Sequence, residues 1–111
     1  MSLAIFKSDD YEADLLQQVE WYAREAGEAV AIRFFEATDS TLIQLARHPG
    51  LGRLRQFRDP RLQGLHSFRV GPPFDNFVIF YRFDAQTLTV WRLMHGSRDL
   101  PLRLTQPPGA A

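Results

Sequence analysis

The chain has 111 residues, no cysteine, and 13 basic residues balanced by 13 acidic ones. This length predicts one domain with one continuous core, which needs neither a disulfide nor a metal in order to fold. The lack of cysteine excludes disulfide frameworks and thiolate zinc sites, and no apolar run approaches the length of a membrane span. Because Met1–Phe6 is also too short for the apolar part of a signal peptide, we expect a cytoplasmic protein.

The balanced net charge hides a difference between the two halves of the chain. Residues 1–46 contain three basic and nine acidic residues, whereas residues 47–111 contain ten arginines and four acidic residues. Such an asymmetry is a hint of a polyanionic or acidic partner. It is equally compatible with acidic helices that pack beside a basic sheet and neutralise it.

The first half of the chain predicts a short strand and two helices. The strand is Leu3–Phe6, and Ser8 with the acidic residues after it favours the start of a helix. Apolar residues at helical spacing predict helices at residues 10–26 and 28–47. Because only Gly27 separates these helices, they must turn back on each other as an antiparallel hairpin. The predicted buried stripes are Leu15, Val19, Tyr22 and Ala26 in the first helix and Ala31, Phe35, Thr38, Leu42 and Leu45 in the second.

The second half predicts a basic loop, three strands and a tail. Residues 49–64 lack periodicity and carry glycine, proline and four arginines, which is typical of a loop. The predicted strands are residues 65–70, 76–83 and 88–95. Residues 101–111 predict a frayed tail after a single domain at 1–100. The resulting order β-α-α-β-β-β indicates an α+β fold, with the helical hairpin on one side of a mainly antiparallel, curved sheet.

The last two strands carry apolar side chains on both faces. With Asp84 opposite Thr87 in the turn, Phe80 faces Trp91 on one surface, and Arg92 lies on the other. Two helices cover only one of these surfaces. Either the tail or the basic loop folds over the second surface, or that surface is a docking site for another polypeptide. The sequence leaves both alternatives open.

The sequence carries no motif for catalysis or for a metal. Its three histidines have no ligand-like spacing, and it has no phosphate-binding glycine loop, no nucleophile elbow and no HExxH. We therefore expect no metal, no cofactor and no catalytic residue.

The arginines are the main candidates for binding. Guanidinium groups bind carboxylates and phosphates in bidentate fashion and keep their charge when they are partly desolvated. A surface of such groups suits an acidic protein segment or a nucleic acid. Arg92 cannot join Arg82 in one site, since the predicted pairing puts them on opposite faces, and Arg98 with Asp99 is open to a second interpretation as a turn. The binding candidates are Arg53, Arg55, Arg61, Arg69, Arg82, Trp91 and Arg98.

Several segments, taken in order, resemble the ParE toxins of the RelE/ParE toxin–antitoxin superfamily over residues 3–100. These segments are Ala13–Leu15 and Trp21–Tyr22 in the first helix, residues 45–52 at the end of the second, and the strand segments 65–70, 76–82 and 92–100. The resemblance implies a bacterial toxin with a role in plasmid stability, which binds DNA gyrase and is neutralised by a cognate, acidic, ParD-like antitoxin. It implies that the antitoxin wraps the toxin with a segment that orders on binding. Membrane binding, and nucleic-acid binding without a partner, are not expected.

RelE-like toxins of the same superfamily offer an alternative function, because they are metal-independent endoribonucleases that cut messenger RNA in the ribosome. Arg98 falls at the arginine of their C-terminal motif, but Pro101 occupies the position where they tend to carry tyrosine. Proline has no proton to exchange and cannot act as an acid or a base. The resemblance therefore favours an inhibitor that binds gyrase over an enzyme.

Overall fold

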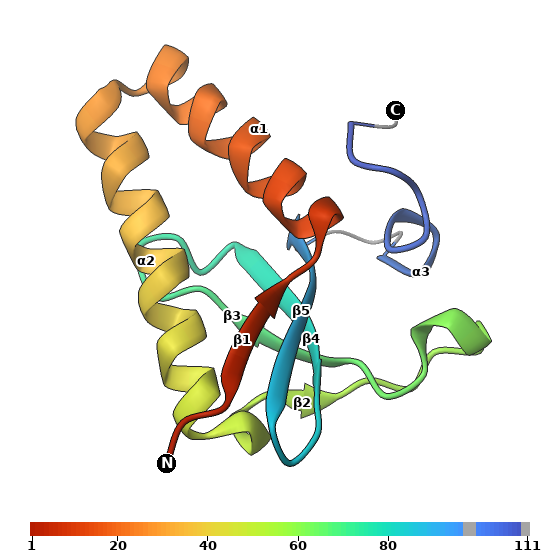
Figure 1. Cartoon of the computed structure of the whole chain (residues 1–111). Coiled ribbons are helices and arrows are strands. Elements are labelled where there is room, and N and C mark those ends of the chain that lie inside the picture. Colours follow the sequence, from red (N-terminus) through yellow and green to blue (C-terminus); the bar gives the residue numbers. More distant parts are fainter. Residues whose placement is uncertain (97–99, 110–111) are drawn as a thin grey trace.

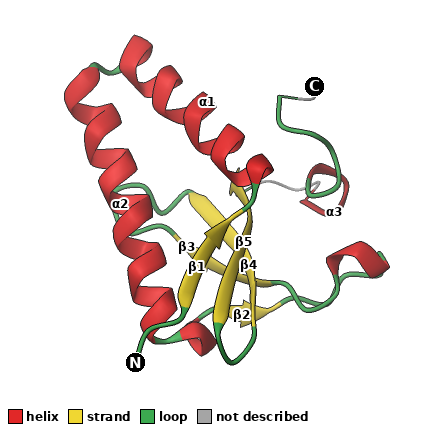
Figure 2. Cartoon of the chain, in the orientation of Figure 1, coloured by secondary structure: helices red, strands yellow, loops and turns green. Residues whose placement is uncertain are grey.

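The computed structural model describes residues 1–96 and 100–109 and has two layers (Figure 1). Helices α1 (Asp9–Glu25) and α2 (Glu28–Arg47) form a hairpin against one face of a sheet. Figure 2 shows the strands gathered beside this hairpin, with the short α3 (Leu100–Arg103) apart from it. The strands are β1 (Ala4–Lys7), β2 (Arg53–Leu54), β3 (His66–Arg69), β4 (Phe77–Phe83) and β5 (Thr87–His95), and the 3-10 turns are η1 (Pro49–Leu51) and η2 (Pro60–Leu62). The predicted α+β fold is confirmed.

Both long helices begin and end within one residue of their predicted limits. Ser8 caps α1, and its hydroxyl accepts a hydrogen bond from the backbone N–H of Tyr11 at 3.0 Å. Gly27 separates α1 from α2 with a φ of 98°, a left-handed conformation that other residues rarely adopt. Among the described residues, no helix is long and apolar enough to cross a membrane.

The burial of two neighbouring phenylalanines of α2 differs from the prediction. Phe35 was expected in the buried stripe but is 46% exposed, whereas Phe34 is fully buried. The ring of Phe34 packs at 5.2 Å from that of Phe74 and at 5.0 Å from that of Phe77, centroid to centroid. Both positions lie near the apolar arc of the helix. The aromatic partners that decide between them come from β4 and the loop before it, which helical spacing does not predict.

The sheet has the order β1-β5-β4-β3-β2, in which β1 is parallel to β5 and the other pairs are antiparallel. Strand β2 was not predicted, because it is a two-residue element inside the expected basic loop. Tyr81 fixes this region: its hydroxyl donates to the carbonyl of Pro49 at 2.6 Å and accepts from the N–H of Gly52 at 2.9 Å. A Cβ on Gly52 would collide with the Tyr81 side chain, so the close contact between the Tyr81 hydroxyl and this backbone requires glycine.

The β4–β5 hairpin follows the predicted register only next to its turn. The N–H of Asp84 donates to the carbonyl of Thr87 at 3.0 Å, as expected. A β-bulge then adds one residue in β5, so Phe80 pairs with Arg92 and not with Trp91. The Ser8 hydroxyl donates to the carbonyl of Trp91 at 2.8 Å, which ties the bulge to the start of α1.

Apolar side chains are buried on both faces of the sheet. The larger cluster lies under the helices and includes Tyr11, Phe34, Leu45, Ile79 and Tyr81. The smaller cluster lies on the opposite face and consists of Leu62, Leu65, Val78, Phe80 and Leu104. The basic loop and the C-terminal segment therefore cover part of the second face, which is the first of the two alternatives that the sequence left open.

The described residues 101–109 differ from the frayed tail that we expected. Leu104 is 1% exposed and completes the smaller cluster. The indole N–H of Trp91 donates to the Leu104 carbonyl at 3.3 Å, and the guanidinium of Arg92 donates to the Arg103 carbonyl, also at 3.3 Å. An apolar anchor and these hydrogen bonds therefore hold the segment on the sheet.

Candidate binding surface

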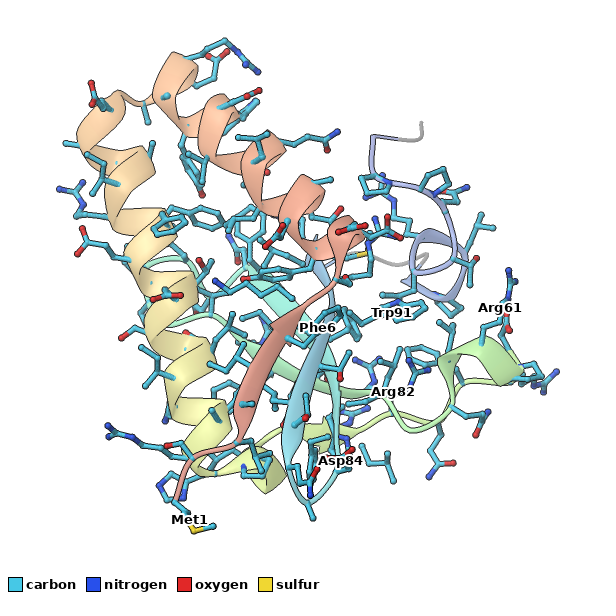
Figure 3. All side chains as sticks on the ribbon, in the orientation of Figure 1. Met1, Phe6, Arg61, Arg82, Asp84 and Trp91 are labelled. Atoms are coloured by element: carbon cyan, nitrogen blue, oxygen red, sulfur yellow. The ribbon has the colours of Figure 1, made fainter. Side chains whose placement is uncertain are left out.

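The sheet face opposite α1 and α2 gathers four of the predicted binding residues. We call it the arginine face and define it by Arg55, Arg61, Arg82 and Trp91. Figure 3 shows Arg61, Arg82 and Trp91 on the side of the sheet away from the two long helices. Strand alternation places Arg82 on the same face as Phe80, and the loop before β3 brings Arg55 and Arg61 to it.

Arg82 is held at the centre of this face. Its Nε donates to the carbonyl of Gln63 at 2.8 Å, and its Nη2 donates to the carbonyl of Arg61 at 2.6 Å. The guanidinium carbon lies 4.9 Å from the ring centroid of Trp91, which is a cation–π distance. Burial lowers the pKa of Arg82, although a guanidinium remains cationic at neutral pH. The chain thus fixes this cation in place before any partner binds.

Arg55 forms a second stack of a cation on aromatic rings. Its Nη1 donates to the hydroxyl of Ser67 at 3.2 Å. Its guanidinium carbon lies 5.3 Å from the ring centroid of Phe57 and 5.9 Å from that of Phe80. Burial, followed by the charge of Arg53, lowers the pKa of Arg55. Two guanidinium groups on one face therefore rest against aromatic rings.

Arg61 lies at the exposed rim and is paired with Asp59. The shortest contact joins Nη2 of Arg61 to Oδ2 of Asp59 at 2.6 Å, and the Arg61 side chain is 68% exposed. The side-chain hydrogen bonds raise the pKa of Arg61 and lower the pKa of Asp59. Because solvent screens the pair, it contributes little to stability.

The remaining candidates are not brought into this cluster. Arg53 is exposed on β2, beside Arg55 but without a stacking contact to an aromatic ring among the described residues. Arg69 is at the end of β3, where its Nη1 donates to the carbonyl of Asp75 at 2.7 Å. Arg98 and Asp99, with the turn predicted for them, lie outside the described residues.

Arg92 lies on the opposite face from Arg82, as the sequence predicted, and it belongs to the core. It is 2% exposed, and its Nε and Nη2 donate to the two carboxylate oxygens of Asp14 at 2.7 and 2.9 Å. The backbone N–H of Leu93 donates to the same carboxylate at 3.0 Å. One feature of the sequence could have indicated this ion pair. Asp14 is one helical turn after the buried Tyr11 and beside Leu15, so it lies on the inner side of α1.

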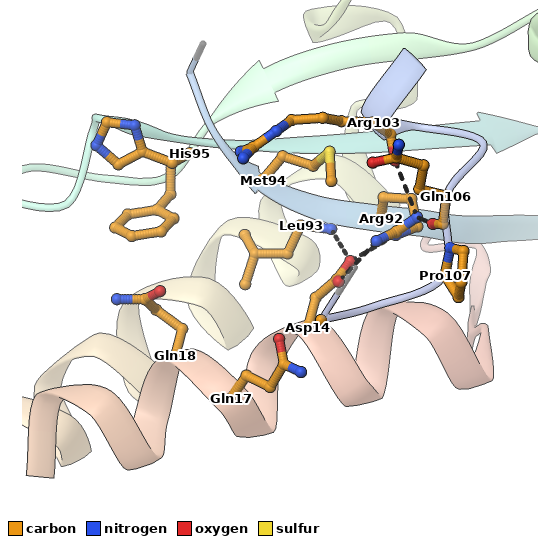
Figure 4. A pocket seen from close by; sticks show the side chains of 12 residues that line it. Asp14, Gln17, Gln18, Arg92, Leu93, Met94, His95, Arg103, Gln106 and Pro107 are labelled. Atoms are coloured by element: carbon orange, nitrogen blue, oxygen red, sulfur yellow. Dashed lines mark hydrogen bonds and ion pairs between the residues drawn. The ribbon is translucent and has the colours of Figure 1, made fainter. Parts of the chain in front are cut away.

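A polar cavity of about 250 Å³ lies between α1, β5 and the C-terminal segment (Figure 4). Gln17 and Gln18 line it from α1, and His95 and Arg103 line it from the other side. The Asp14 carboxylate at this cavity is bound to Arg92 and is therefore not available as a base. Within residues 1–96 and 100–109, no cluster of histidine and acidic side chains could hold a metal ion.

The chemistry of the arginine face is suited to binding anionic groups. In the described part of the chain it consists of cations and aromatic rings, and the Asp59 carboxylate beside it is bound to Arg61. The described β-strand histidines serve other contacts: the ring of His66 stacks at 5.5 Å on Tyr81, and that of His95 packs at 5.3 Å against Phe77. The face therefore offers charge and flat surfaces for a partner, with no free acid–base pair among these residues.

Comparison with known proteins gives a matching family and several similar solved structures. The family described as the ParE toxin of the type II toxin–antitoxin system, parDE, matches residues 5–100. The chromosomal ParDE toxin–antitoxin system from P. aeruginosa has a TM-score of 0.69 and 14% identity, covering 86% of this chain and 98% of that chain. The RelBE2 toxin–antitoxin complex from Mycobacterium tuberculosis has a TM-score of 0.58 and 18% identity, covering 86% of this chain and 100% of that chain. At such identities these structures share the fold, and no curated protein sequence matches.

Proposed function

Because the chain belongs to the ParE toxin family of type II toxin–antitoxin systems, we propose that it inhibits DNA gyrase and that a cognate acidic antitoxin neutralises it. The observation that carries this proposal is the arginine face, in which Arg55 and Arg82 are held rigidly against aromatic rings. Preformed cationic surfaces of this kind bind acidic protein segments, because little side-chain entropy is lost on association. Both gyrase and the antitoxin are protein partners, and the proposal places the encounter in the cytoplasm.

The alternative is a RelE-like ribonuclease, and the fold similarity to RelBE2 is the reason to consider it. Cleavage of RNA requires a group that takes a proton from the ribose 2′-hydroxyl. Pro101 stands where the family resemblance places a tyrosine, and it has no exchangeable proton. The described residues of the arginine face also contain no free carboxylate or imidazole. These features support inhibition by binding.

The antitoxin is proposed to bind the same face. Arg61 is solvent-exposed and already donates hydrogen bonds to a carboxylate, so an acidic side chain of the antitoxin fits where Asp59 now lies. The excess of arginine in residues 47–111 favours such a partner and speeds its approach. Neutralisation then follows from competition, since antitoxin and gyrase would need the same arginines.

The test compares gyrase supercoiling with cleavage of ribosome-bound message, using the purified chain. We expect supercoiling to be inhibited and the message to stay intact. Arg61→Ala should weaken inhibition by about tenfold or more, as expected for an exposed interface arginine. Arg33→Ala, which changes an exposed arginine on α2, is the matched control and should leave inhibition unchanged. Cleavage of the message with gyrase unaffected would instead establish the ribonuclease.

A further inference from the structure

Strand β1 ends the sheet with backbone groups that have no partner strand. The N–H of Ala4 donates to the carbonyl of Gln86, just before β5, and the N–H of Ser8 donates to the carbonyl of Val90 in β5, both at 3.0 Å. Because backbone groups alternate along a strand, the N–H and C=O groups of Ile5 and Lys7 point away from β5. Figure 1 shows β1 in front of β5, and none of the described helices or loops lies across its outer edge.

This edge lacks the features that usually prevent strand pairing. Natural edges are blunted by proline, by bulges, by exposed charges or by a covering element. The only charge in β1 is Lys7, whose ammonium group bonds the carboxylate of Asp39 at 3.4 Å. Phe6 is 60% exposed and lies beside Thr89, which itself pairs with Arg82, so the Phe6 side chain is on the sheet face opposite the long helices. The edge is therefore apolar and open.

A row of exposed apolar side chains on α2 lies beside this edge. Ile32, Phe35 and Ile43 are 50%, 46% and 46% exposed. Together with Asp39 they are three or four residues apart and so lie on one side of the helix. Since Asp39 bonds Lys7, that side of α2 is the one that borders β1. We define the edge patch by both sides of this edge: Ile5, Ile32, Phe35 and Ile43 lie on the α2 side, and Phe6 lies on the opposite face of the sheet.

We propose that the edge patch joins two copies of this chain, with β1 of one copy pairing antiparallel to β1 of the second. The register follows from the outward backbone groups. With Phe6 opposite Phe6 of the second copy, Ile5 lies opposite Lys7 of the second copy on each side of the two-fold axis. Ile5 and Lys7 then exchange all of their outward N–H and C=O groups, in four hydrogen bonds. A register centred on Ile5 would instead involve Leu3, whose N–H already donates to the carbonyl of Ala46 at 2.9 Å.

The same symmetry explains the apolar row on α2. A two-fold axis perpendicular to the sheet extends it across the two copies and keeps both helical hairpins on one side. The two rows of Ile32, Phe35 and Ile43 then border the same seam and cover each other. From their exposed fractions, the five residues of the edge patch offer roughly 500 Å² per copy, compared with the about 800 Å² typical of one side of a stable interface, and the paired backbone of β1 adds to this area.

A second copy fits this surface better than an unrelated strand does. An added strand would satisfy the backbone of Ile5 and Lys7 but would leave the helical row exposed. A second copy supplies both a strand and an apolar helix at the required spacing. Because Lys7 and Asp39 already neutralise each other, bringing two such edges together adds little repulsion.

The first test measures the molar mass of the full chain by sedimentation as a function of concentration. We expect a monomer–dimer equilibrium. Phe6→Lys should weaken it by at least about 100-fold, because it removes an apolar contact and places like charges opposite each other. Leu102→Lys is the matched control: Leu102 is 62% exposed but lies in α3, away from the patch, so dimerisation should be unchanged. A native circular dichroism spectrum shows that each variant folds.

The second test reports the register directly. The chain has no cysteine, so Phe6→Cys introduces a single thiol. In the proposed register the two thiols face each other across the axis, with Cβ atoms about 5 Å apart, close enough for a disulfide after a small shift. Oxidation should therefore give a covalent dimer at low protein concentration, whereas Leu102→Cys should stay monomeric. A monomer at every concentration with no Phe6→Cys cross-link overturns the proposal. So does a monomeric chain in which Phe6→Lys abolishes antitoxin binding, because the edge would then receive a strand of the antitoxin. Gyrase inhibition is not used in either test, so its failure leaves this result unaffected.

Discussion

The buried pair of Asp14 and Arg92 makes the strongest prediction for stability. The side chains of Arg92 and Asp14 are 3% and 8% exposed, and the carboxylate also accepts the N–H of Leu93. Asp14→Asn keeps the shape of the side chain but leaves the Arg92 charge buried without a counter-charge. Removing one member of such a pair typically costs about 3–5 kcal/mol of the free energy of unfolding. For a domain of this size that corresponds to a fall in Tm of about 12–20 °C.

Urea unfolding of the wild type and Asp14→Asn, followed by circular dichroism, measures this difference at constant pH. Asp10→Asn is the control, since Asp10 is an exposed acid in the first turn of the same helix, where loss of charge costs at most about 1 kcal/mol. The double variant Asp14→Leu with Arg92→Met should recover most of the loss, because an apolar pair needs no desolvation of charge. A loss below about 1 kcal/mol in Asp14→Asn would refute the reasoning, since it would mean that water reaches the Arg92 guanidinium.

Two further predictions concern the C-terminal segment and the hairpin turn. Leu104→Ala should lower the free energy of unfolding by about 2–4 kcal/mol, because Leu104 is 1% exposed and its side chain is packed. Leu102→Ala is the control and should change the free energy of unfolding little, because Leu102 is 62% exposed. Equal effects of the two variants in urea unfolding would contradict the packing of this segment. Asp84 accepts the N–H groups of Gln86 and Thr87, both at 2.8 Å, and these bonds hold its pKa below its ordinary value of 3.8. Its folded pKa is therefore lower than its unfolded pKa, so the stabilisation is complete above the unfolded pKa and is lost as pH falls through the folded one. An NMR titration of the Asp84 carboxyl carbon checks the direction, and a pKa at or above the ordinary value would show that the turn is open in solution.

Local patterns in the sequence were sufficient for most of the fold. Helical spacing, the Ser8 cap and Gly27 set both helices, because these signals act within a few residues. The hairpin turn set the register of β5 from Thr87 to Val90. The bulge at Trp91 could not be predicted, since a hydroxyl from Ser8, more than eighty residues earlier, holds its carbonyl.

The candidate site was predicted in composition but not in arrangement. The sequence named Arg55, Arg61, Arg82 and Trp91 and placed Arg92 on the opposite face, but it did not predict that Arg92 is buried in an ion pair. That ion pair depends on Asp14, which is 78 residues away in the chain, and no local pattern reports such a contact. The predicted pairing put Arg82 on the Trp91 face, but it did not predict the stacking of Arg55 on Phe57 and Phe80, because that depends on the path of the loop before β3.

The C-terminal segment connects the buried Asp14–Arg92 pair to the arginine face. A variant in this segment should therefore affect the arginine face and the edge patch differently. Arg92 donates to Asp14 and to the carbonyl of Arg103, while its neighbour Trp91 donates to the next carbonyl, that of Leu104, and stacks with Arg82. Loss of the Leu104 anchor should therefore disturb the Trp91–Arg82 stack and weaken partner binding. The edge patch takes no support from this segment among the described contacts, because β1 is held by β5 and α2. Leu104→Ala should thus reduce antitoxin and gyrase binding and leave dimerisation intact, whereas Phe6→Lys should do the reverse. If one variant abolished both activities, the two surfaces would have to be a single interface.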